Sequence, residues 1–130
     1  MEGPNDTFVA LGDSVLLSCS SDISTDVDSV DWRYRPSTQG QGQCNVIHDD
    51  DEWIGVVVGT GIVPNKHKHK FSFEVHYENV SISLKPYQNL RIYNVSYNEA
   101  GCYACIDRGG LDDAIVAGQV RTAHLVVIGN

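Results

Sequence analysis

The sequence predicts an all-β fold, a sandwich or barrel of about eight to ten short strands. Two observations carry this prediction. Apolar and polar residues alternate with a period of two along most of the chain, as expected for strands with one buried face. Clusters of Gly, Pro, Asn, Asp and Ser separate the apolar runs, and no stretch has the periodicity of a long helix. The length of 130 residues is sufficient for one domain.

The first strands are predicted from the apolar runs of the N-terminal part. Phe8–Leu11 is a short apolar run that ends at the turn residues 12–14, and Val15–Cys19 follows as a second strand. Residues 20–29 are polar and acidic, which predicts a loop. The next strand, Val30–Arg35, alternates strictly. It places Val30, Trp32 and Tyr34 on one face and Asp31, Arg33 and Arg35 on the other.

Shorter runs predict the remaining strands. Residues 36–43 are rich in Gly, Gln and Ser and predict a turn. The pattern between residues 49 and 89 does not decide how the runs in that segment pair. The strands expected after the turn are Cys44–Ile47, Ile54–Val58, Phe71–Val75, Val80–Leu84, Leu90–Val95, Gly101–Ile106 and Leu125–Ile128.

Charge and hydropathy argue against several classes of function. Nine Lys and Arg against 17 Asp and Glu give a net charge of −8, which disfavours a nucleic-acid backbone as a partner. The best apolar run, Ile54–Val63, is too short for a membrane span, which requires roughly 18 residues. The chain has no G-x-S-x-G motif, no Ser/His/Asp set in a recognisable context and no metal signature. We therefore expect no catalytic residue, no cofactor and no enzyme activity.

The chemical state of the four cysteines is informative about the cellular compartment and the fold. They are Cys19, Cys44, Cys102 and Cys105. A zinc ribbon uses two close pairs, whereas only Cys102 and Cys105 are close, and they lie in a strand-like stretch. A redox C-x-x-C motif opens a helix, and no helix is predicted here. Two disulfides in an exported protein are therefore favoured. Zinc ligands, reduced core thiols and catalytic thiols are the alternatives that the pattern leaves open.

Three N-x-S/T sequons, at Asn5, Asn79 and Asn94, are candidate glycosylation sites and agree with an exported protein. No hydrophobic signal segment follows Met1. We therefore expect an extracellular fragment, from a cell-surface ectodomain or a secreted protein, in which Met1 is an expression start. Any leader or membrane anchor would lie outside it.

A set of residues in fixed order resembles the signature of immunoglobulin domains. An early Cys precedes a Trp, and a later L-x-I-x-x-V leads into E-x-G-x-Y-x-C. The long spacing between the outer cysteines leaves room for extra strands, so the resemblance points to the V-set and covers residues 1–130 as one domain. The matching positions are Cys19, Trp32, Leu90, Ile92, Val95, Glu99, Gly101, Tyr103 and Cys105.

The resemblance implies a V-type Greek-key β-sandwich of two antiparallel sheets. In this family the equivalents of Cys19 and Cys105 form a bridge between the sheets, and the equivalent of Trp32 packs against that bridge. We therefore expect the same bridge here.

The resemblance also assigns roles at the corner that leads into the late cysteine strand. Tyr103 would anchor the corner through its hydroxyl group, and Gly101 would form the tight turn before it. Glu99 is the acid that pairs in this family with a basic residue at the start of strand D. That residue is Lys70 if strand D is Phe71–Val75, and no partner is evident if strand D is Val80–Leu84.

The chain departs from antigen-receptor V domains in several places. Arg33 follows the Trp where Tyr or Val is usual, and Ala117–Thr122 only partly matches the family's F-G-x-G-T strand. The segment Asp49–Glu78 is about eight residues longer than the pattern needs. These differences favour a receptor or adhesion V domain, or an invertebrate V-type immune molecule.

The other two cysteines, Cys44 and Cys102, are predicted to lie on the outer face of the sandwich. Because Tyr103 and Cys105 point inward, Cys102 points outward on the G-F-C-C′ sheet, and Cys44 opens strand C′. A Cys44–Cys102 bridge is predicted, and it requires the C–C′ turn to fold over strand C. The alternatives are two unpaired thiols, or a link from Cys44 to another chain.

In this family the G-F-C-C′ face and the B–C, C′–C″ and F–G loops meet partners. Acidic residues crowd these loops here, and their potential would attract basic partners unless they serve solubility alone. Trp53 follows the acidic run, either as an exposed contact or packed under a strand. The candidate contact residues are Arg33, Arg35, Asp49, Asp50, Asp51, Glu52, Trp53, Ala104, Ile106, Arg108, Gly109, Gly110 and Leu111.

A basic run, Lys66–Lys70, contains His67 and His69, which would share one face of a strand. The neighbouring lysines repel a divalent cation, so a solvated hairpin is favoured over a metal site. The acidic loops lack the D-x-D-x-D-G spacing of a calcium loop, so no metal ligand is assigned.

Together these observations predict the recognition or adhesion module of a cell-surface receptor, which binds a protein partner or another copy of itself. The alternative is a soluble immune-type module that binds microbial or carbohydrate ligands. We expect no nucleic acid as a partner. Membrane association is expected only through an anchor outside this chain.

Overall fold

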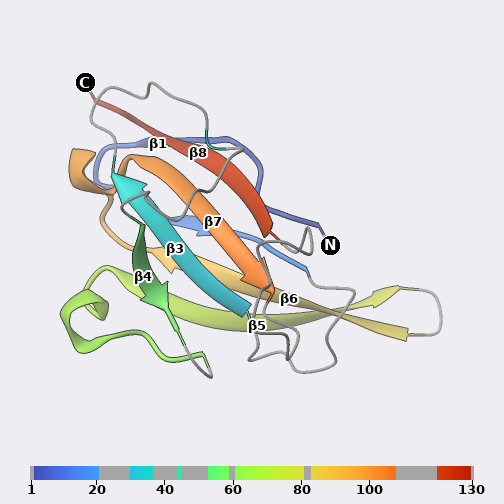
Figure 1. Ribbon diagram of the computed structural model, residues 1–130. Helices are drawn as coiled ribbons and strands as arrows, with labels where there is room; N and C mark the ends of the chain where they lie inside the picture. The colour runs from blue at the N-terminus through green and yellow to red at the C-terminus, as the bar shows by residue number, and fades with distance from the viewer. Residues whose placement is uncertain are drawn as a thin grey trace.

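A computed structural model of the chain shows two β-sheets packed face to face (Figure 1). It describes residues 2–20, 30–36, 44, 53–58, 61–80, 83–107 and 120–129. The elements of these residues are β1 (Thr7–Ala10), β2 (Val15–Leu17), β3 (Val30–Pro36), β4 (Ile54–Val57), β5 (Phe71–Val80), β6 (Ser83–Ile92), β7 (Gly101–Asp107) and β8 (Val120–Ile128), with the short 3-10 helices η2 (Asn65–His67) and η3 (Tyr97–Glu99).

The large sheet contains β1, β8, β7, β3 and β4 in this order, and the small sheet contains β2, β6 and β5. The two sheets enclose one cluster of buried apolar side chains, in which Trp32, Leu90, Ile92 and Tyr103 are fully buried. The prediction of an all-β, two-sheet sandwich is therefore confirmed for the described residues.

The large sheet is mixed, which corrects the expectation of two antiparallel sheets. β1 runs parallel to β8, with Thr7 opposite Leu125 and Ala10 opposite Ile128, whereas the other strand pairs of this sheet are antiparallel. Alternation of apolar residues reports which face of a strand is buried and carries no information on strand direction. No short turn joins β1 to β8 either, so local sequence does not determine their relative direction.

The chain passes from the large sheet to the small sheet directly after β1. Gly12 has a φ of 91°, in the left-handed region that strains any residue with a side chain. Its N–H donates to the carbonyl of Val95, and the N–H of Leu11 donates to the carbonyl of Ile128. This turn closes one edge of the sandwich and explains why the apolar run before it ends here.

A disulfide between Cys19 and Cys105 links the chain after β2 to β7, with the α-carbons 6.5 Å apart. Both cysteines lie in the same buried cluster as Trp32. The indole Nε1 of Trp32 donates to the backbone carbonyl of Gln88 on β6 at 3.3 Å, so this side chain contacts the opposite sheet through a polar group as well. The sequence predicted this disulfide through the family resemblance.

The corner between β6 and β7 is closed by hydrogen bonds. The Tyr103 hydroxyl donates to the carbonyl of Glu99 at 2.6 Å. The Glu99 carboxylate accepts a hydrogen bond from the Ser96 N–H at 2.8 Å. It also lies 3.2 Å from the Nζ atom of Lys70, the residue directly before β5. Gly101, where β7 begins, has a φ of 141°. The chain therefore turns into β7 through a left-handed glycine next to a buried carboxylate.

The strands between residues 71 and 95 differ from those predicted. Val80–Leu84 is not a strand of its own, because Val80 pairs with Ser83 at the end of one long β5–β6 hairpin. This hairpin extends beyond the rest of the small sheet (Figure 1). Tyr77 and Leu84 are more than half exposed there, so the apolar pattern that marks a buried face is lost.

Candidate functional site

The outer face of the large sheet carries several of the predicted contact residues. The alternation of β3 places Arg33 and Arg35 on this face, opposite Ala104 and Cys102 of β7 in the strand register. The Arg33 guanidinium lies 3.7 Å from the carboxylate of Asp31, the next outward residue of the same strand. Strand pairing on both sides of β3 fixes the backbone of these arginines.

A second disulfide, Cys44–Cys102, lies on this face, with the α-carbons 5.4 Å apart. The predicted bridge is thus present, and the alternatives of unpaired thiols or a link from Cys44 to another chain are wrong. Cys44 itself lies outside any strand, which corrects the start of the predicted strand Cys44–Ile47; the remainder of that range is outside the described residues. Arg35 Nη2 donates to Cys102 Sγ at 3.6 Å, so the arginine packs against the bridge.

Trp53, directly before β4, completes this group. The guanidinium carbon of Arg35 lies 5.1 Å from the centre of the Trp53 ring, within the range of a cation–π contact. Trp53 is partly buried, so it is packed on the sheet and still reaches the surface. We call Arg33, Arg35 and Trp53 the arginine–tryptophan cluster.

Ala104 and Ile106 do not form the exposed centre that the sequence predicted. Both are buried, with 0% and 2% of their surface exposed. They form a small apolar cluster against which Trp53 and Val120 pack. The alternation of β7 correctly points them away from the main core, but it could not show that Trp53, from the segment directly before β4, packs against them.

Other predicted contact residues lie outside the described part of the chain. Asp107, one position beyond the predicted strand Gly101–Ile106, is the last residue of β7 and is fully buried opposite Val30. The undescribed positions are Asp49, Asp50, Asp51, Glu52, Arg108, Gly109, Gly110 and Leu111.

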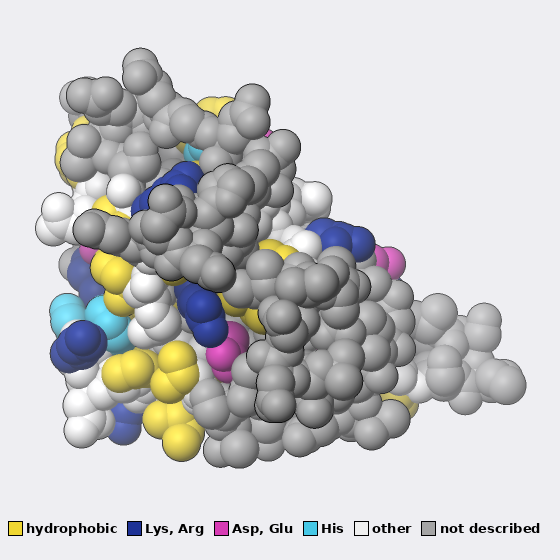
Figure 2. Space-filling model, in the orientation of Figure 1, with side chains coloured by type: hydrophobic (Ala, Val, Ile, Leu, Met, Phe, Trp, Pro, Cys, Tyr) yellow, Lys and Arg dark blue, Asp and Glu magenta, His cyan; other side chains and the backbone are white. Residues whose placement is uncertain are grey.

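The basic run does not form the expected hairpin. Lys66 and His67 belong to η2, and residues 68–70 form the turn before β5, so His67 and His69 do not share a strand face. Figure 2 shows histidine and lysine side chains gathered at this edge of the molecule. The His67 ring stands edge-on to Phe71, with 5.9 Å between the ring centres. Its partial burial, with the positive charge of Lys66 and His69, lowers the pKa of His67.

One set of potential metal ligands lies behind the second disulfide. The side-chain ligand atoms of Cys44, Cys102 and His124 are within 4.8 Å of one another. Both sulfur atoms are joined in the disulfide, so neither is a thiolate ligand while the bridge is intact. The geometry therefore describes a disulfide next to a histidine.

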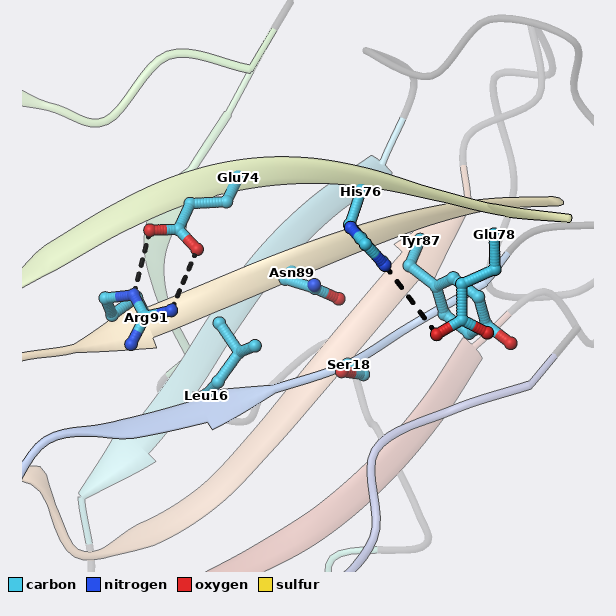
Figure 3. A pocket seen from close by; sticks show the side chains of 8 residues that line it. All are labelled: Leu16, Ser18, Glu74, His76, Glu78, Tyr87, Asn89 and Arg91. Atoms are coloured by element: carbon cyan, nitrogen blue, oxygen red, sulfur yellow. Dashed lines mark hydrogen bonds and ion pairs between the residues drawn. The ribbon is translucent and has the colours of Figure 1, made fainter. Parts of the chain in front are cut away.

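A groove of about 390 Å³ lies on the outer face of the small sheet (Figure 3). This groove was not predicted from the sequence. Its signal was the run of polar residues at every second position of β5 and β6, which was missed because the hairpin was divided at the wrong place. The groove is lined by Leu16 of β2 and Ser18 directly after it, by Glu74, His76 and Glu78 of β5, and by Tyr87, Asn89 and Arg91 of β6.

The three sequon asparagines, Asn5, Asn79 and Asn94, are exposed. Asn94 has a φ of 47°, a left-handed conformation that asparagine tolerates better than most residues. Exposure is a requirement for glycosylation, which remains a prediction at these positions.

No protein-family model matches the sequence, and no curated protein matches it. Among the described residues there is no helix long and apolar enough to cross a membrane.

Proposed function

We propose that this chain is an extracellular recognition domain of the V-set immunoglobulin type, which binds a protein partner through the outer face of its large sheet. The observation that carries the proposal is the arginine–tryptophan cluster, held on a rigid sheet beside the Cys44–Cys102 disulfide. Arg and Trp are the side chains most enriched among the residues that dominate binding energy at protein interfaces.

The strand order supports the V-set assignment. In the pairing order β1-β8-β7-β3-β4 over β2-β6-β5, the strand that carries Arg33 is β3, which lies inside the large sheet between β7 and β4. The disulfide Cys19–Cys105 joins the sheets, and the Tyr103 hydroxyl group closes the corner before it. These features are the ones that the family resemblance depends on.

Two disulfides are typical of an oxidising compartment, which supports an extracellular or secretory location. The arginine–tryptophan cluster then faces other exported proteins. The molecule has a net charge of −8, so the positive cluster of one copy can be attracted to the acidic surface of another. The proposed protein partner therefore includes a second copy of this domain.

The test uses the oxidised domain, assembled as fluorescent tetramers and applied to live cells of the organism that encodes it. Reversing both charges with Arg33→Glu and Arg35→Glu should lower cell binding by about tenfold or more, because the cluster would lie at the contact. The matched control, Lys66→Glu with Lys68→Glu, makes the same charge change at two exposed positions, one in η2 and one directly after it, and should leave binding unchanged. Thermal unfolding and disulfide mapping verify that each variant is folded.

Two outcomes contradict the proposal. One is equal loss of binding in the control variant, which would indicate a general charge effect. The other is unchanged binding after Arg33→Glu and Arg35→Glu. Sedimentation of the purified domain at low and high salt tests the version with a second copy as partner, and a strict monomer over tens of micromolar removes that version.

A further inference from the structure

The groove of the small sheet lies on the face of the sandwich opposite the arginine–tryptophan cluster. β6 is the central strand of this sheet, so its outward side chains form the floor, and residues from β2 and β5 form the two walls. Figure 3 shows Asn89 over β6, between His76 on one side and Ser18 on the other. The groove is thus built by regular strand geometry and not by a loop.

Asn89 is the side chain that points to a ligand. Only 4% of its surface is exposed, and its Oδ1 atom has no hydrogen-bond partner among the described residues. Buried polar atoms are nearly always paired, since an unmade hydrogen bond costs free energy. A hydroxyl donor that enters the groove would supply the missing bond, and the amide NH₂ group can donate to the same ligand.

The charges of the groove select against ionic ligands. The Arg91 guanidinium makes two hydrogen bonds to the Glu74 carboxylate, at 2.8 and 3.2 Å, so these two charges neutralise each other. Glu78 would repel an anion. The Lys85 ammonium, which is paired with the Glu2 carboxylate at 2.7 Å, lies 5.4 Å from the centre of the Tyr87 ring and already occupies the cation position over that ring. A neutral ligand that makes many hydrogen bonds is neither repelled by Glu78 nor in competition with the Lys85 ammonium.

We propose that this groove binds a neutral hexose ring. Each sugar hydroxyl group can both donate and accept a hydrogen bond, so it needs both kinds of partner. The groove offers donors and acceptors in Asn89, the Ser18 hydroxyl group and His76. Leu16 and Tyr87 supply apolar surface for the C–H groups of the ring. A volume of about 390 Å³ is within the usual range for small-molecule sites. The site is separate from the proposed protein-binding face, so neither depends on the other.

The experiment titrates the ¹⁵N-labelled, oxidised domain with glucose, galactose, mannose and N-acetylglucosamine in turn, and follows amide chemical shifts by NMR. We expect saturable shifts for at least one sugar, with a millimolar dissociation constant because the ligand is small and the groove is open. The shifted amides should belong to residues near Ser18, on β5 from Glu74 to Glu78, and on β6 from Tyr87 to Arg91.

Variants test whether Asn89 holds the ligand. Asn89→Leu removes its donor and acceptor at similar volume and should weaken sugar binding by tenfold or more. The matched control is Asn98→Leu, the same change at an exposed position of η3, and it should bind like the wild type. Ser18→Ala changes an exposed position and is a second test of the site if Asn89→Leu fails to fold. It should also weaken sugar binding.

Three results overturn the inference. The first is that none of the four sugars shifts the groove amides at concentrations up to the limit of solubility. The second is that Ser18→Ala and a folded Asn89→Leu bind a sugar as tightly as the wild type. The third is that spermidine or inorganic phosphate saturates the groove when the sugars do not. The variant Arg33→Glu with Arg35→Glu should bind sugar normally, which keeps this test independent of the proposed function.

Discussion

Glu99 shows how one carboxylate can organise a corner of the sandwich. Only 6% of the residue is exposed, yet its Oε1 atom accepts from the N–H and the hydroxyl group of Ser96 and lies 3.2 Å from Lys70 Nζ. Its backbone carbonyl accepts from Tyr103. The residue therefore joins the chain before β5, the η3 turn and β7.

We expect Glu99→Gln to lower the free energy of unfolding by about 2 kcal/mol, because it removes a mostly buried charge from hydrogen-bonded partners. The matched control is Glu74→Gln, which removes the same charge from a more exposed pair with Arg91 and should lower the free energy of unfolding much less. Urea denaturation measures both changes. An equal loss in the two variants would mean that the corner contributes no more than a surface ion pair.

His67 makes the free energy of unfolding depend on pH. Burial, Lys66 and His69 lower its pKa below the ordinary value of 6.5, so the unfolded chain binds a proton at His67 more readily than the folded chain does. Stability should therefore fall as the pH drops from about 7.5 through 6.5 and level off below the folded pKa. Denaturation at a series of pH values should show a smaller fall for His67→Gln; parallel curves for wild type and variant would contradict this assignment.

At the level of structural elements, the Cys44–Cys102 bridge is expected to stabilise the fold. It closes a sequence separation of 58 residues and holds Cys44 against the outer face of β7. Replacing both cysteines with alanine should lower the free energy of unfolding by about 2–4 kcal/mol, mainly because the unfolded chain gains freedom. Thermal and urea unfolding measure the change, with peptide mapping to verify that Cys19–Cys105 is intact. A variant as stable as the wild type would show that the bridge does not restrict the unfolded chain.

Elements were predicted well where one face is buried and poorly where both faces are exposed. β3 and β7 begin as their alternation predicts and end one residue later, at Pro36 and Asp107, because each strand packs one face on the core. The β5–β6 hairpin was divided wrongly, because the half near its tip has little buried apolar surface. Its register depends on pairing between strands, which a single-strand pattern does not contain.

At the scale of the molecule, the sequence predicted the sandwich and both disulfides. The contacts of Tyr103 with Glu99 and of Lys70 with Glu99 also lie where the resemblance expected them. The burial of Ala104 and Ile106 was not predictable, because it depends on Trp53, which lies far from β7 in the sequence. The groove around Asn89 left a local signal in the alternating polar residues of β5 and β6, but its remaining side comes from Leu16 and Ser18, far away in the sequence.

The parallel pairing of β1 and β8 has a mechanical consequence. The two ends of the chain lie at opposite ends of β8 (Figure 1). Tension applied through these ends therefore pulls β1 and β8 in opposite directions along their length, and the hydrogen bonds between Thr7–Ala10 and Leu125–Ile128 carry the force together in shear. Beyond that point, the Cys19–Cys105 disulfide limits how far the chain can extend. The sandwich is thus arranged to resist stretching between two attachments.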